Sequence, residues 1–111
     1  MSFKVKLQPQ AKADLDAILA RIKERSPSGA ASWYRAWTDA RKLLARQADI
    51  YSVAPEDEDH EILVQQILFR TRRGNHYRAV FTVVDGTAHV LHIRGQGQDS
   101  IPQAELHPPN E

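Results

Sequence analysis

The sequence predicts a small α+β domain in which an antiparallel helix hairpin packs on a small, mainly antiparallel sheet, in the chain order β-α-α-β-β-β. Apolar residues recur every three to four positions through most of the first half of the chain, as they do in amphipathic helices. Near residue 61 the apolar period changes to two, which is typical of half-buried strands. The short stretch "FKVKL" also alternates, so one strand is expected to precede the helices.

The first strand and the first helix are predicted from residues 3–25. In "FKVKL" the apolar side chains lie on one side of the strand and two lysines on the other, so the lysine side should face water. Pro9 suits the first turn of a helix, and the apolar stripe that follows predicts a helix over residues 9–25.

A second helix is predicted after the interruption "SPSG", where Ser26 or Ser28 can serve as its N-cap. Two helices joined by so short a connection must be antiparallel neighbours. The second apolar stripe consists of Trp33, Trp37, Ala40, Leu43 and Leu44.

The second half of the chain predicts a three-stranded meander. Residues 48–61 lack a period and hold six acids, so they are expected to form a solvent-exposed loop. Strands are expected at 62–72, 76–84 and 88–94, with "RRGN" joining the first two and the dipeptide "DG" forming a two-residue hairpin turn before the last. The core is expected to contain Leu15, Ile18, Ile22, Trp37, Leu44, Phe69, Phe81 and Leu91.

Period two assigns the strand residues to faces. The side chains expected to point toward the helices are Tyr77, Ala79, Phe81, Val83, Leu91 and Ile93. The opposite face should then carry Arg78, Val80, Thr82, Val90, His92 and Arg94. With Arg70, Arg72 and Arg73 at its rim, this face is expected to be a shallow, arginine-rich surface.

Composition and charge restrict the possible functions. The chain has 111 residues and no cysteine, which excludes disulfides and thiolate chemistry and fits a cytoplasmic protein. No apolar run is long enough to cross a membrane. The net charge of +1 hides a strong segregation, because residues 1–48 hold ten bases against four acids whereas 49–61 hold six acids and no base. Residues 1–98 are expected to form the domain, and 99–111 an extended tail.

Arginine clusters bind anions, but arginine cannot transfer protons. Proton transfer needs other groups, and the candidates are His76, His89, His92, Tyr77 and, more weakly, His60 with Glu61. The segment "EDEDHE" lacks the spacing of metal ligands, so neither a metal nor another cofactor is expected.

The chain resembles the RelE/ParE superfamily of toxins from bacterial type II toxin–antitoxin systems, which include plasmid stabilisation proteins. The resemblance extends from "FKVKL" through "QPQAKADLDAILARI", "SPSGAASWYRAWTDARKLL" and "YSVAPE" to "RTRRGNHYRAVFTVVDGTAHVLHIR". It implies the β-α-α-β-β-β fold and a cognate acidic antitoxin as partner. By charge, the expected surface for the antitoxin or the target comprises Arg70, Arg72, Arg73, Arg78 and Arg94.

The resemblance implies two alternative functions. The favoured one is a ParE-like inhibitor that binds DNA gyrase and needs no catalytic residues. The alternative is a RelE-like, ribosome-dependent mRNA endoribonuclease, in which the catalytic residues would be Arg78, His92 and Arg94. Arg78 in "HYRAVF" matches a recurrent arginine of the nucleases, whereas Arg94 is near but not aligned with a second one. The chain lacks the lysines expected in "VQQILF" and the tyrosine or histidine expected in "RGQGQDSIP", which favours the gyrase inhibitor.

Overall fold

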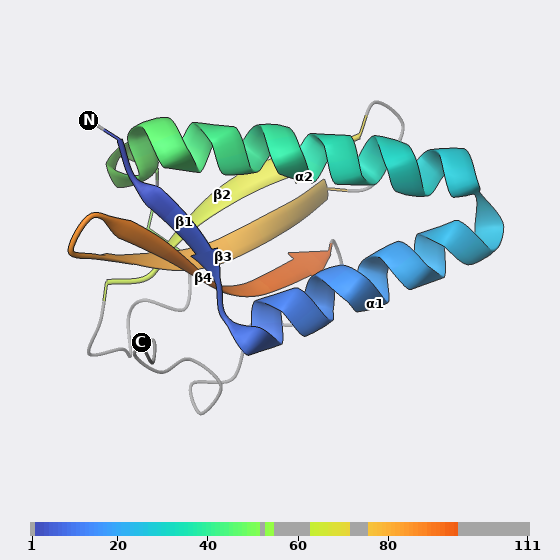
Figure 1. Cartoon of the computed structure of the whole chain (residues 1–111), viewed down its shortest axis with the longest axis horizontal. Helices are drawn as coiled ribbons and strands as arrows, with labels where there is room; N and C mark the ends of the chain where they lie inside the picture. The colour runs from blue at the N-terminus through green and yellow to red at the C-terminus, as the bar shows by residue number, and fades with distance from the viewer. Residues whose placement is uncertain (1, 52, 55–62, 72–75, 96–111) are drawn as a thin grey trace.

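The computed structural model describes residues 2–51, 53–54, 63–71 and 76–95, in which two long helices lie on one face of a twisted sheet (Figure 1). In chain order the elements are β1 (Lys4–Leu7), α1 (Pro9–Arg25), α2 (Pro27–Gln47), the short 3-10 helix η1 (Ala48–Ile50), β2 (Gln65–Arg70), β3 (His76–Val84) and β4 (Thr87–Gly95). The predicted fold class and element order are confirmed. The tail predicted for residues 99–111 lies outside the described residues.

The described strands form one sheet in the order β1-β4-β3-β2. Strands β2, β3 and β4 make the predicted antiparallel meander, and β1 pairs in parallel with the first half of β4. At the β3–β4 turn, φ is 49° at Asp85 and 77° at Gly86. Positive φ at both central residues is what a type I′ hairpin turn requires, so the predicted "DG" turn is confirmed.

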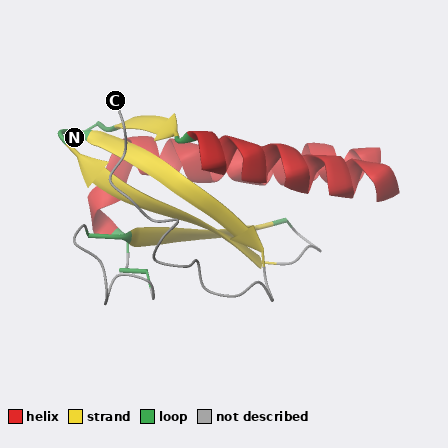
Figure 2. Cartoon of the chain, turned by 90° about the horizontal axis from the view of Figure 1, so that it is seen from below, coloured by secondary structure: helices red, strands yellow, loops and turns green. Residues whose placement is uncertain are grey.

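The helices form an antiparallel hairpin on the same side of the sheet (Figure 2). Ser26 is the residue between the two helices. Its N–H donates to the carbonyl of Ile22 in α1, and its Oγ accepts a hydrogen bond of 3.0 Å from the N–H of Gly29 in α2. It therefore ends α1 and caps α2, as one of the two predicted caps.

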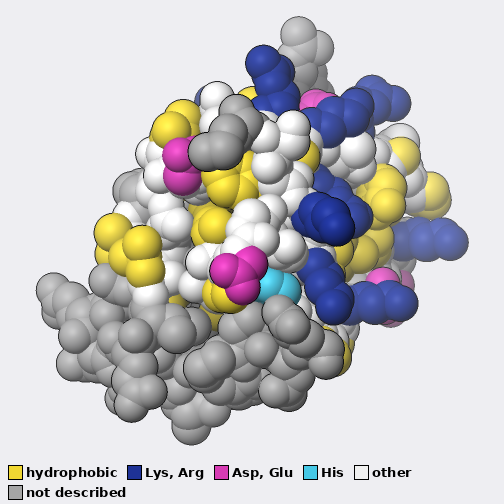
Figure 3. Space-filling model, turned by 60° about the vertical axis from the view of Figure 1, so that its left-hand side comes forward, with side chains coloured by type: hydrophobic (Ala, Val, Ile, Leu, Met, Phe, Trp, Pro, Cys, Tyr) yellow, Lys and Arg dark blue, Asp and Glu magenta, His cyan; other side chains and the backbone are white. Residues whose placement is uncertain are grey.

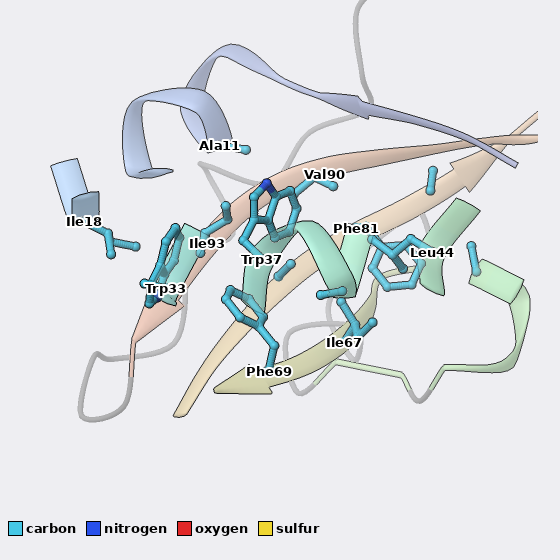
Figure 4. Close-up of a cluster of buried hydrophobic side chains, with 14 residues drawn as sticks. Ala11, Ile18, Trp33, Trp37, Leu44, Ile67, Phe69, Phe81, Val90 and Ile93 are labelled. Atoms are coloured by element: carbon cyan, nitrogen blue, oxygen red, sulfur yellow. The ribbon is translucent and has the colours of Figure 1, made fainter. Parts of the chain in front are cut away.

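The main core lies between the helices and the sheet, around two tryptophans of α2 (Figure 4). Trp33 and Trp37 are each 1% exposed, and their ring centroids lie 5.6 and 5.7 Å from that of Phe69 on β2. Aromatic pairs at such separations stabilise beyond the area that they bury. The predicted core residues buried in this cluster are Ile18, Trp37, Leu44, Phe69 and Phe81, and Leu15 and Ile22 pack against it partly buried.

A β-bulge changes the face assignment that period two gave for β4. Val80 pairs with His92 but Phe81 pairs with Val90, so Leu91 is an extra residue on β4. Val90 consequently lies in the core under the helices, while Leu91 packs with Val80 on the opposite face. The predicted faces of Val90 and Leu91 are therefore wrong, whereas those of the β3 residues are confirmed.

The face opposite the helices was predicted to be open, but part of it is covered and has a small core of its own. Ala54, Val64, Val80 and Leu91 form a second buried cluster. The N–H of Ala54 donates to the carbonyl of Val64 at 2.8 Å, which fixes the described part of the segment before β2 against the sheet. The segment predicted as an exposed loop, residues 48–61, thus contributes two buried residues, Ala48 of η1 and Ala54.

Candidate anion-binding site on the sheet

Two arginines lie side by side on the sheet face opposite the helices. Arg78 of β3 is the cross-strand partner of Arg94 of β4, and on its other side Arg78 is paired with Leu68 of β2. The three side chains form a row across the sheet, since directly paired residues share a face. Leu68 is 63% exposed, so this end of the face is accessible to a partner.

Polar contacts orient one arginine of the pair and leave part of the other unsatisfied. Nη1 of Arg78 donates to Oε1 of Gln66 on β2 at 3.3 Å. Nε of Arg94 is buried and has no hydrogen-bond partner in the described part of the structure. A buried donor without a partner is costly, and an incoming acceptor would remove that cost.

The arginine pair places two like charges at directly opposed strand positions. Like charges directly opposite each other on neighbouring strands are destabilising, by about 0.2–1 kcal/mol. Guanidinium groups bind carboxylates and phosphates through paired hydrogen bonds. Together, the two side chains can bind an anionic group that bridges β3 and β4.

The other arginines predicted for this surface are only partly placed. Arg70 ends β2, is exposed, and pairs with His76, so it lies on the same face one row from Arg78. Arg72 and Arg73 lie outside the described residues. The structure thus places Arg70, Arg78 and Arg94 on one face.

His92 does not face solvent, contrary to the prediction. It is 1% exposed, and its Nδ1 lies 3.4 Å from Oδ2 of Asp14 on α1. The same carboxylate oxygen accepts a 3.0 Å hydrogen bond from the N–H of Ile93. The reason is that β1 pairs only with the first half of β4, and α1 lies along the remaining edge. Asp14 attaches that helix to the strand, a role that the sequence pattern alone did not indicate.

Of the other candidate proton-transfer groups, Tyr77 and His89 are held in the fold, whereas His76 is exposed. The ring of Tyr77 stacks on Phe69 at 5.9 Å and meets Trp33 edge-on at 5.4 Å. His89 is 3% exposed, with Nδ1 3.1 Å from Nε2 of Gln8. His76 is exposed, at the start of β3. His60 and Glu61 lie outside the described residues.

A groove of about 530 Å³ adjoins the arginine face, between α2 and the outer edge of β2. Its lining residues are Ser32, Arg35, Ala36, Asp39, Ala40, Leu43, Leu68, Phe69, Arg70 and Thr71. Leu43, which belongs to the second apolar stripe of the sequence, is 40% exposed and lines this groove, because its position on α2 faces the strand edge and not the sheet. Apolar periodicity along the sequence does not indicate this groove.

The described residues contain no group of three or more histidine, aspartate or glutamate side chains suited to hold a metal ion. Neither described helix combines the length and apolar character needed to cross a membrane.

The fold and the site define a RelE/ParE superfamily toxin. The family described as "ParE toxin of type II toxin-antitoxin system, parDE" matches residues 5–100, and the chain belongs to this family. It is the toxin of a type II toxin–antitoxin system and has an antitoxin as partner. A solved structure of a chromosomal ParDE TA system from P. aeruginosa shares the fold, with a TM-score of 0.65, 22% identity, and coverage of 85% of this chain and 96% of the other. Comparison with curated proteins gives no significant match.

Proposed function

We propose that this toxin inhibits DNA gyrase by binding it, without catalysing a reaction of its own. The observation that carries the proposal is the state of the candidate acid–base groups. His92 is buried against Asp14, and Tyr77 is packed among the core aromatics. An RNA-cleaving site has to move protons with groups that reach the substrate. Within the described residues, the exposed face near Arg78 offers anion-binding arginines, and His76 is the candidate proton-transfer group exposed on it.

Membership of the ParE family supports the same function, because gyrase inhibition is the activity typical of ParE toxins. The competing function is the ribosome-dependent endoribonuclease. It would require Arg78, Arg94 and a proton donor at one accessible place, and burial of His92 removes the donor that the sequence analysis favoured.

The purified toxin should be assayed in parallel for inhibition of gyrase supercoiling and for cleavage of mRNA on programmed ribosomes. We expect inhibition of supercoiling and no cleavage. The variant His92→Gln, checked for folding by its melting temperature, should inhibit as the wild type does. Codon-positioned cleavage that the variant loses, with supercoiling unaffected by either protein, would establish the endoribonuclease instead.

The antitoxin is the second partner, and we infer that an acidic segment of it binds across the arginine pair. Charge complementarity supports this placement, since Arg78 and Arg94 are opposite each other on the sheet. The exposed Leu68 in the same row offers an apolar contact beside the charges. A segment that presents acidic side chains with an apolar one beside them would match this row.

Affinity for the antitoxin can test this placement. The double variant Arg78→Glu/Arg94→Glu should bind at least about tenfold more weakly, because truncating or reversing charges in an interface costs several kcal/mol. The matched control is Lys23→Glu/Arg25→Glu, which makes the same change of charge at the exposed end of α1. For the apolar contact, Leu68→Ser is compared with Ile50→Ser, whose side chain is 66% exposed on η1. Equal effects of test and control variants would place the antitoxin elsewhere.

A further inference from the structure

A second positively charged surface lies at the β1 edge of the sheet, away from the end of β4 that holds Arg94. Figure 3 shows lysine and arginine side chains gathered along one side of the surface. We call the exposed members from β1, α1 and α2 the basic stripe, and they are Lys4, Lys6, Lys12, Arg41, Lys42 and Arg46. The sequence analysis had assigned the lysines of β1 to water and given them no role.

Tertiary contacts bring the three elements of the basic stripe together. The N–H of Phe3 donates to the carbonyl of Ala45 on α2 at 2.7 Å, and Nη2 of Arg41 lies 3.4 Å from the carbonyl oxygen of Val5. Strand β1 and the C-terminal half of α2 therefore run side by side. Lys4 and Lys6 alternate with the apolar residues of β1, so both project from the sheet on the exposed side.

The remaining members extend the surface at both ends. Lys12 lies in the first turn of α1, just after β1. Lys42 and Arg46 are one helical turn apart on the outer side of α2. The positive surface thus crosses from one helix to the other over the strand between them.

The charges of the basic stripe are not neutralised within the described fold. In the described part of the chain, none of its six members forms an ion pair. Asp16 and Asp85 are exposed near its borders, on α1 and at the β3–β4 turn. A row of like charges without ion-pair partners among the described residues concentrates positive potential on this side of a chain whose net charge is only +1.

The composition of the basic stripe distinguishes a nucleic acid from a protein as its partner. Protein interfaces are depleted in lysine and depend on buried aromatic or apolar anchors. Lysine contacts to a phosphate backbone need no such anchors. The exposed apolar residues of α2 lie elsewhere: Leu43 is in the groove beside β2, and Tyr34 precedes Arg41 by two helical turns. Bases could not stack within the stripe itself, so a double helix fits it better than a single strand.

We propose that the basic stripe binds the phosphate backbone of duplex DNA. The choice of DNA over duplex RNA rests on the proposed function, because gyrase acts on DNA. Arg94 lies at the far end of β4 from the residues that pair with β1, so the antitoxin surface and the lysines of β1 are centred on different ends of that strand. The toxin could then contact DNA at one end of β4 while the other end contacts protein.

Binding of the purified toxin to a short fluorescein-labelled DNA duplex, measured by anisotropy between about 50 and 200 mM salt, tests the proposal. The test variant is Lys4→Gln/Lys6→Gln/Lys12→Gln. Each lost phosphate contact should reduce the slope of log K against log salt by about 0.9, which corresponds to about an eightfold loss of affinity at 0.1 M salt. Three lost contacts would weaken binding by several hundredfold.

The matched control is Arg21→Gln/Lys23→Gln/Arg25→Gln, which removes three exposed positive charges from the other end of α1. It should change affinity much less, and melting curves should show that both variants fold. If the control loses as much affinity as the test variant, net charge alone explains binding and the proposal fails.

Binding of RNA and of poly-glutamate should be measured in the same way, to test whether duplex DNA is the preferred ligand. Preferential binding of duplex RNA or of single-stranded RNA would overturn the assignment to DNA. Binding of poly-glutamate through the same three lysines, with no binding of DNA, would assign the stripe to an acidic protein. The DNA measurement contains no gyrase, so its result is independent of the supercoiling assay that tests the proposed function.

Discussion

Replacing Arg94 with methionine should stabilise the toxin while weakening its binding. Arg94 faces Arg78 across two strands, and its Nε is buried without a partner in the described structure. Like charges on directly opposed strand residues destabilise a sheet. Removing the unsatisfied donor contributes in the same direction by about 1–3 kcal/mol, partly offset by lost packing of the arginine head. Methionine keeps a long unbranched stem, so the expected net gain is about 0.5–1.5 kcal/mol.

Thermal unfolding measures this gain directly. For a domain of this size, about 1 kcal/mol corresponds to a shift of about 4–8 °C in Tm, so Arg94→Met should melt several degrees higher. The part of the gain due to repulsion should shrink at 1 M salt, where the Debye length is about 3 Å.

The control is Arg70→Met at the exposed end of β2, whose cross-strand partner is His76. It should change stability by less than about 0.5 kcal/mol. A lower Tm for Arg94→Met at low salt would refute the reasoning, because it would mean that favourable contacts hold the pair together in the free toxin. Unchanged affinity of this variant for the antitoxin would separate the arginine pair from the proposed binding surface.

Three further substitutions test the fold around the site by urea or thermal denaturation. Asp14→Ala should cost about 1–3 kcal/mol, because the N–H of Ile93 loses its acceptor and His92 its neighbouring carboxylate; an unchanged stability would show that α1 does not depend on this attachment. Ser26→Ala should cost about 1 kcal/mol through loss of the N-cap of α2, and Ser26→Gly only a few tenths. Gly86→Val should cost at least about 1 kcal/mol, although a Cβ there meets no atom within 4 Å, because φ is +77°; a neutral result would mean that the turn can change its conformation.

The sequence by itself determined the elements and much of the arginine surface. Apolar periodicity located both helices and the strands, because the side that each element buries is repeated locally along it. Ser26 and the "DG" turn marked junctions through their own backbone chemistry. The face of Arg78 followed from its phase with Phe81, which the structure buries under the helices.

Only the tertiary structure decided the features that depend on pairing between distant segments. The bulge at Leu91 reverses the phase of part of β4, and nothing in the alternation of that strand indicates an extra residue. The short parallel pairing of β1 leaves half of the β4 edge to α1, which buries His92 beside Asp14. The basic stripe exists because β1 and α2 lie side by side. Periodicity describes which side of an element is apolar, but the neighbour that covers each side is set by strand order and helix placement, which are non-local.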